Sequence, residues 1–300
     1  MQPEPIRYFD RYAKVTKTEK VFGERWLRFA YENPVGRLAV WLLARRKIFS
    51  WYYGRQMNKP GSDIDIFKFI ADYDIDASEF VKSAFEFETF NQFFHRALKP
   101  ECRPIAQGPG VAVLPADGRH LVFPDVNKAN GFYVKGSKFT LPELLGDEEL
   151  AKRFAGGAML ISRLCPSDYH RFHFPVSGIP SEARLVKGSL YSVSPIALRR
   201  NIQYLVRNKR FVTLVEAPEF GTVAMIEVGA TNVGSIVEGF VPGRAVVKGE
   251  EKGMFAFGGS CVITLFRPSC IIFDADLVEQ SAAFTETYAR MGDRLGIGIG

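Results

Sequence analysis

Three short segments of the chain carry residue types that together could activate a hydroxyl group. Asp117 lies in a PADG segment, His170 and His173 lie in DYHRFHFP, and Ser260 ends an FGGS segment. A carboxylate, a histidine and a serine are the groups that base-assisted activation of a serine oxygen requires. The sequence therefore suggests a site built from Asp117, His173 and Ser260, provided that the fold brings the three segments together.

Each of these segments also has an ordinary structural explanation. Asp-Gly is a common hairpin turn, so Asp117 could serve a turn alone. Two glycines inside the strand-like run KGMFAFGGSCVITLF are typical of a bulge or a bend, because glycine weakens a strand interior. His170 and His173 would face opposite sides of a strand, whereas in a turn both could line one cavity. On the residues alone both explanations stay open.

Several common catalytic motifs are absent from the sequence. It holds no GxSxG, no Rossmann or P-loop glycine pattern and no HExxH, which disfavours ordinary hydrolase and nucleotide chemistry. The four cysteines match neither a paired zinc spacing nor a secreted scaffold, and we expect free thiols. Two histidines three residues apart, with one aspartate and a cysteine, are a poor set of ligands for a metal ion, so we predict no metal. A zinc peptidase-like protein or a barrel-type binding module remains an alternative.

The elements that must position these residues divide the chain in two. An apolar fraction of 47% is ample for a packed core. We expect an α+β fold, with a helical N-terminal region over residues 1–100 and a β-rich barrel or sandwich as the catalytic domain over residues 101–300. The expected helices are Thr18–Gln56 with a break at Asn33-Pro34, Ile64–Phe69, Ser78–Leu98, Leu141–Phe154 and Asp276–Met291.

The basic charge of the protein is concentrated at its N-terminus. Residues 1–60 hold 13 Lys and Arg against 5 Asp and Glu, and they contain all three tryptophans. Aromatic rings beside cations suit a helix that lies in a membrane interface, although an ordinary amphipathic helix pair explains the same pattern. The candidate membrane-docking residues are Trp26, Trp41, Trp51, Arg45, Arg46 and Lys47. The N-terminus shows no secretion signal.

Five ordered blocks of the sequence resemble the phosphatidylserine decarboxylase family, whose members are pyruvoyl enzymes made as self-cleaving proenzymes. The blocks are 90-FNQFFHRALKPECRP-104, 115-PADG-118, 168-DYHRFHFP-175, 228-VGATNVGSI-236 and 257-FGGS-260. The last is similar to the family's Leu-Gly-Ser-Thr cleavage motif. It departs from that motif by Gly258 in place of leucine and by Cys261 in place of threonine, next to the reacting bond.

The resemblance implies a role for each residue of the candidate site. His173, oriented by Asp117, would accept the hydroxyl proton of Ser260, whose oxygen would attack the carbonyl of Gly259. The resulting ester would break by β-elimination into chains 1–259 and 260–300, and residue 260 would become a pyruvoyl cofactor. His170 is the implied proton donor in decarboxylation, with His173 as the alternative.

The implied reaction converts phosphatidylserine to phosphatidylethanolamine and CO2 through a Schiff base to the pyruvoyl group. The implied partners are phosphatidylserine, an anionic membrane surface and the two cleavage products as a heterodimer, with further dimerisation left open and no nucleic acid. The implied location is peripheral, on the cytoplasmic face of the cell membrane. A soluble pyruvoyl-dependent amino-acid decarboxylase of the same fold is an alternative, because the self-cleaving core does not fix the substrate.

Overall fold

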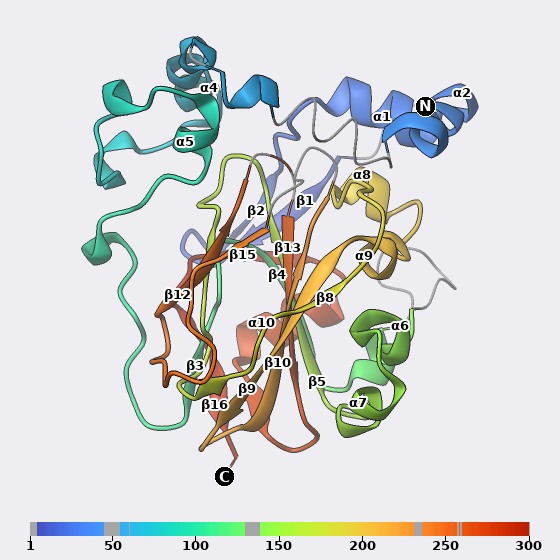
Figure 1. The fold of residues 1–300 in the computed structure, drawn as a ribbon, viewed down its shortest axis with the longest axis vertical. Helices are drawn as coiled ribbons and strands as arrows, with labels where there is room; N and C mark the ends of the chain where they lie inside the picture. The colour runs from blue at the N-terminus through green and yellow to red at the C-terminus, as the bar shows by residue number, and fades with distance from the viewer. Residues whose placement is uncertain are drawn as a thin grey trace.

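A large open β-sheet forms the centre of the molecule (Figure 1). The computed structural model describes residues 5–44, 55–59, 61–129, 139–230, 236–256, 258 and 260–299. Within these ranges the sheet has ten strands, and β8 (Arg184–Val186) pairs with β9 beside β7. The path runs through β2 (Val15–Thr18), β1 (Arg7–Asp10), β15 (Glu286–Ala289), β4 (Gly118–Phe123), β5 (Ala158–Leu164), β13 (Ser260–Phe266), β10 (Gly221–Val228), β9 (Arg210–Ala217) and β7 (Ile179–Pro180).

Both faces of the large sheet are covered, so the protein is an α+β sandwich and not a closed barrel. Two three-stranded sheets pack on one face and helices pack on the other. The small sheets are β11 (Ile236–Glu238), β12 (Glu251–Phe255) and β6 (Arg171–His173), and β14 (Ile271–Phe273), β16 (Arg294–Gly298) and β3 (Val111–Val113). The helices are α6 (Leu141–Leu145), α7 (Glu148–Arg153), α8 (Pro195–Leu198) and α9 (Tyr204–Arg207). The expected β-rich α+β fold is confirmed.

The N-terminal helices lie at one end of the large sheet (Figure 1). They are α1 (Glu24–Glu32), α2 (Pro34–Ala39), α4 (Ile66–Tyr73) and α5 (Phe90–Phe94). A phenylalanine-rich core that includes Phe69 and Phe93 joins α4 to α5. The first described element is a strand, however, because β1 pairs in parallel with β15 and antiparallel with β2. The first segment of the expected helical region is therefore part of the sheet.

The expected long helix over Ser78–Leu98 is replaced by three short turns of helix. Asp76, Ser83 and Thr89 each accept a hydrogen bond from a backbone N–H two or three residues ahead. Side chains of this kind compete with the continuous helix by satisfying the first N–H groups of a new one. Capping residues at such close spacing explain why helix over this segment forms only in pieces, of which α5 is the last.

Two other expected helices are shorter than predicted. The one over Leu141–Phe154 is split where Gly146 adopts a left-handed conformation (φ 65°) and Asp147 caps α7. The one over Asp276–Met291 ends early: α10 (Ala275–Ala282) is followed by β15, which pairs with β1 and β4. Pairing on both sides outweighs the local helical pattern in the second half of that segment.

A buried ion network ties the N-terminal segment to the sheet. Arg163 on β5 contacts Glu19 at 2.6 Å and Glu286 on β15 at 2.5 Å. All three residues are more than nine-tenths buried. Arg163 pairs with both carboxylates, and Arg119 Nε adds a contact to Glu19 at 3.4 Å. Removing the Arg163 guanidinium would therefore leave two buried carboxylates with one cation fewer beside them.

We predict that Arg163→Met lowers the free energy of unfolding by about 3–5 kcal/mol, because two buried carboxylates lose the cation that they share. Urea denaturation followed by circular dichroism measures this loss. The matched control is Arg244→Met, which removes an exposed pair with Glu250 and should cost less than about 1 kcal/mol. Equal losses in the two variants would contradict the assignment of the network as a stabilising centre.

Candidate active site

Neighbouring strands bring Asp117 and Ser260 to the same end of the large sheet. Ser260 begins β13 and pairs with Leu164, the last residue of β5. On the other side of β5, β4 begins at Gly118, directly after Asp117. Gly118 is required there, because a Cβ atom would lie 2.5 Å from the carbonyl oxygen of Arg163. Strands in a sheet lie about 4.8 Å apart, so two strand spacings, roughly 10 Å, separate Asp117 from Ser260.

The histidine segment reaches the same end through backbone hydrogen bonds. The N–H of His173 donates to the carbonyl of Pro115 at 2.8 Å, and the N–H of Phe255 donates to the carbonyl of His170 at 2.9 Å. Phe255 ends β12, the strand that precedes Ser260 in the chain. The fold thus gathers the three sequence segments, which are far apart along the chain, into one region.

Three polar atoms in this region are buried and unpaired. Ser260 Oγ, His170 Nε2 and His173 Nδ1 have no hydrogen-bond partner among the described residues. The side chains themselves are almost completely buried. Buried polar groups in folded proteins are nearly always hydrogen-bonded, and exceptions are frequent at functional sites. These atoms are therefore available for chemistry.

Asp117 is held by an arginine and not by His173. Its carboxylate accepts hydrogen bonds from Arg103 Nε at 2.9 Å and Nη2 at 2.6 Å, and from the N–H of Met291 at 2.8 Å. Burial raises the pKa of Asp117, and the Arg103 guanidinium opposes that rise. Among the described residues no hydrogen bond joins the carboxylate of Asp117 to His173. Sequence reasoning gave Arg103 no role, although a buried carboxylate requires a cation nearby.

Both histidines are neutral bases in this environment. Burial lowers the pKa of His170 to about 3 and that of His173 to about 3. His170 Nδ1 lies 2.9 Å from the carbonyl oxygen of Asp168 and must donate, because a carbonyl only accepts. Its Nε2 is consequently an unprotonated acceptor. The ring packs against Phe94 with 3.8 Å between ring centroids and 37° between the ring planes, which restricts its orientation.

The remaining predicted residues lie elsewhere or outside the described residues. Trp26 and Trp41 are exposed on the N-terminal helices, with 78% and 52% of their surface accessible. Those outside the described residues are Gly259, Arg45, Arg46, Lys47 and Trp51. Within the described parts of the chain, no helix has the length and apolarity to cross a membrane.

No metal site supports the zinc alternative. In the part of the chain that the structure describes, no group of three or more His, Cys, Asp or Glu side chains could hold a metal ion. Asp117, which that alternative would use as a ligand, is already engaged by Arg103.

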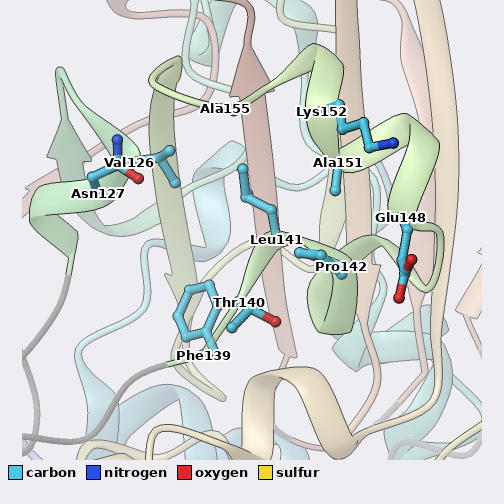
Figure 2. Close-up of a pocket in the computed structure, with 10 residues that line it drawn as sticks. All are labelled: Val126, Asn127, Phe139, Thr140, Leu141, Pro142, Glu148, Ala151, Lys152 and Ala155. Carbon is cyan, nitrogen blue, oxygen red and sulfur yellow. The ribbon is translucent and has the colours of Figure 1, made fainter.

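A surface groove of about 490 Å³ is separate from the candidate site. Figure 2 shows its lining, which comes mainly from the segment before α6 and from α6 and α7. Ala155 on its rim precedes β5 by three residues, whereas Ser260 pairs with the last residue of that strand. At about 3.3 Å per residue the groove lies roughly 20 Å or more from Ser260. It contains none of the candidate residues.

Comparison with known proteins decides the family. The model of the family described as phosphatidylserine decarboxylase matches residues 90–297, a range that contains Asp117, His170, His173 and Ser260. The chain belongs to the phosphatidylserine decarboxylase family. The match begins with α5, so the exposed Trp26 and Trp41 lie outside it.

Relatives within the phosphatidylserine decarboxylase family match nearly the whole chain, and each of the following is named phosphatidylserine decarboxylase proenzyme. The protein from Fusobacterium nucleatum subsp. nucleatum is 43% identical over 296 residues, which is 99% of each chain. The protein from Chlamydia pneumoniae is 45% identical over 290 residues, 97% of this chain and 96% of its own. The protein from Chlamydia muridarum is 45% identical over 296 residues, 99% of this chain and 98% of its own.

The buried histidines predict a pH-dependent stability. The unfolded chain binds protons to these groups below about pH 6.5, whereas the folded chain resists protonation down to about pH 3. The contribution of the neutral histidines to the free energy of unfolding is therefore complete above pH 6.5. On acidification it should fall by up to about 1.4 kcal/mol per pH unit for each histidine. Urea titrations between pH 7 and pH 5 measure this slope. A His170→Gln/His173→Gln variant should show a shallower slope, and an unchanged slope would contradict the prediction.

Proposed function

We propose that this chain is a proenzyme that cuts its own Gly259–Ser260 bond and then decarboxylates phosphatidylserine to phosphatidylethanolamine. Family membership and the names of the relatives support the reaction. The observation that carries the proposal is the buried Ser260 Oγ, at the end of the sheet where two neutral imidazoles also lie. None of these three groups has all of its polar atoms paired within the described residues.

Self-cleavage uses groups that this chain supplies. His173 accepts the hydroxyl proton of Ser260 and the serine oxygen bonds to the carbonyl carbon of Gly259. The C–N bond then breaks as the nitrogen of residue 260 takes up a proton. A neutral imidazole can act in this way, and burial keeps His173 neutral. β-Elimination at residue 260 then removes the Cα proton and expels the carboxylate of Gly259, which separates chain 1–259 from chain 260–300. Hydrolysis of the resulting dehydroalanine by one water molecule releases ammonia and leaves a ketone at position 260.

In this scheme Asp117 is a positioning residue. Its carboxylate, fixed by Arg103, accepts the N–H of Met291 and anchors the turn into β4 at the end of the sheet where Ser260 begins β13. The turn also carries Pro115, whose carbonyl fixes the backbone of His173. Neutralising Asp117 would loosen both contacts, so its effect reaches His173 through the backbone and not through a direct hydrogen bond.

The residues around position 260 fit a pyruvoyl group. Ser260, its precursor, starts a central strand and is completely buried, and free nitrogens of His170 and His173 lie at the same end of the sheet. A pyruvoyl ketone supplies an electron sink for loss of CO2 from an amine substrate. His170 Nε2 can hold and return the proton that the product requires, and the closed site keeps water away from the reaction.

We predict that Ser260→Ala remains a single chain, because it lacks the attacking oxygen. His173→Ala and Asp117→Asn should cleave on the order of 100-fold more slowly, whereas His170→Ala should cleave and yet decarboxylate poorly. Intact mass spectrometry and CO2 release measure the two steps. His95→Gln is the matched control and should behave as wild type. Cleavage of Ser260→Ala at this bond would overturn the proposal.

The N-terminal helices are proposed to dock on an anionic membrane, which would make the protein peripheral on the cytoplasmic face. Tyr31 buries one side of α1 against the body and its hydroxyl accepts the N–H of Ser192 at 2.8 Å. Trp26 and Phe29, one turn apart on the same helix, stay exposed and their rings meet edge to face. Exposed aromatic residues in a basic segment suit an anionic membrane surface, because the rings can enter the apolar lipid region while the cations contact the anionic headgroups.

We predict that Trp26→Ala/Trp41→Ala weakens binding to anionic vesicles on the order of 100-fold, because two large apolar side chains lose their burial in lipid. Flotation with phosphatidylserine-containing vesicles measures the binding, and phosphatidylcholine vesicles test the charge dependence. Ile272→Ala removes an equally exposed apolar side chain on β14 and should leave binding unchanged. Wild-type protein that stays unbound to anionic vesicles would favour a soluble amino-acid decarboxylase.

A further inference from the structure

A buried cluster of charges lies between the large sheet and the β11–β12–β6 sheet. Lys252 is completely buried, and its Nζ lies 3.1 Å from Glu227 Oε2 and 2.6 Å from Glu238 Oε2. The rings of Phe172 and Phe240 cover the ammonium at 5.4 and 4.9 Å from their centroids. Glu227 is also completely buried, and its Oε1 has no partner among the described residues.

The backbone aims Lys252 into this cluster through a β-bulge. Glu251 pairs with His173 and Gly253 pairs with Phe172, so Lys252 is the extra residue of β12. Bulges redirect side chains and occur frequently beside active sites. The bulge turns an otherwise costly lysine toward the interior of the protein, only eight residues before Ser260.

The strand register places Glu227 beside Ser260. Glu227 on β10 is directly opposite Val262 on β13, and Ser260 is two residues from Val262 on that strand. Side chains two residues apart on a strand share a face, so Glu227 and Ser260 are diagonal neighbours with about 7–8 Å between them. A glutamate side chain spans that distance directly or through one water molecule.

The cluster contains one positive and two negative groups in a dry environment. Lys252 can neutralise one carboxylate, so the second is favoured in its protonated form. Burial raises the pKa of Glu227 to about 8, Lys252 lowers it and Glu238 raises it. From β9 Glu227 faces Phe211, and from β13 it faces Val262 with Ser260 and Thr264 at the diagonals. Lys252 from β12 and Glu238 from β11 are the charged groups of the described residues that act on it.

We propose that this cluster holds one exchangeable proton beside Ser260 and that Glu227 donates it when the Gly259–Ser260 bond breaks. The inference rests on the self-cleavage proposed above. The Ser260 oxygen gives its proton to a histidine and bonds to the carbonyl carbon, and the C–N bond breaks. The departing nitrogen requires a proton, which Glu227 supplies, and the resulting carboxylate remains paired with the Lys252 ammonium.

The test is the pH profile of self-cleavage, measured by intact mass on precursor made in a cell-free pulse and chased between pH 6 and pH 10. The wild-type rate should fall above about pH 8, where Glu227 loses its proton. The glutamine of Glu227→Gln cannot donate a proton, so this variant should cleave on the order of 100-fold more slowly. It should also lose the fall in rate near pH 8, which is the alkaline limb of the profile. Glu238→Gln should move the limb about one pH unit down, and Lys252→Met about one unit up.

The opposite shifts separate an acid–base role from a structural one, which would lower the rate without moving the limb. Glu216→Gln on the neighbouring strand β9 is the matched control and should keep the wild-type profile. If Lys252→Met fails to fold, the Glu238→Gln shift decides alone, because Glu238 is partly exposed. A fixed limb in Glu238→Gln, or Glu227→Gln at the wild-type rate, overturns this inference while wild-type cleavage stands. A wild-type chain that never cleaves overturns the proposed function itself.

Discussion

The proposed mechanism depends on the pairing of β13 between β5 and β10. Seven consecutive residues from Ser260 to Phe266 pair with β5, and six of the strand's residues pair with β10. A residue at the start of such a strand has a fixed backbone, and its side chain is sealed from water. The bond before it can then be broken without releasing the strand, because ladder hydrogen bonds and two apolar cores hold chain 260–300 in place. This supports the proposed heterodimer of the two cleavage products.

The same end of the sheet combines low polarity with unpaired polar atoms. Unpaired polar atoms of His170, His173 and Ser260 each destabilise the folded protein, because no described residue offers them a hydrogen bond in the interior. Ion pairs nearby fix the surrounding backbone, as at Asp117 with Arg103 and at Arg163 with Glu286. The structure thus holds the reacting groups within a frame that includes these buried ion pairs.

Much of the site could be predicted from the sequence because its residues lie in short local blocks. Glycine pairs, Asp-Gly and the two histidines signal unusual backbone or chemistry within a few residues, and the α+β class follows from short apolar runs. The partner of Asp117 could not be predicted, because Arg103 reaches it through tertiary packing. The proposed roles of Glu227 and Lys252 could not be predicted for the same reason, because the two residues lie on different strands and a bulge directs the lysine inward. Pairing with distant strands likewise explains why the second half of the helix expected over Asp276–Met291 contains strand β15.

The central claim is that Ser260 becomes the cofactor of this phosphatidylserine decarboxylase family member. The most direct measurement is the accurate mass of the fragment 260–300, before and after treatment with a carbonyl reagent such as phenylhydrazine. The account predicts a fragment lighter than the serine-started peptide by one molecule of ammonia, which gains the mass of one hydrazone on treatment. A fragment with the mass of an intact N-terminal serine and no reaction with phenylhydrazine would contradict it.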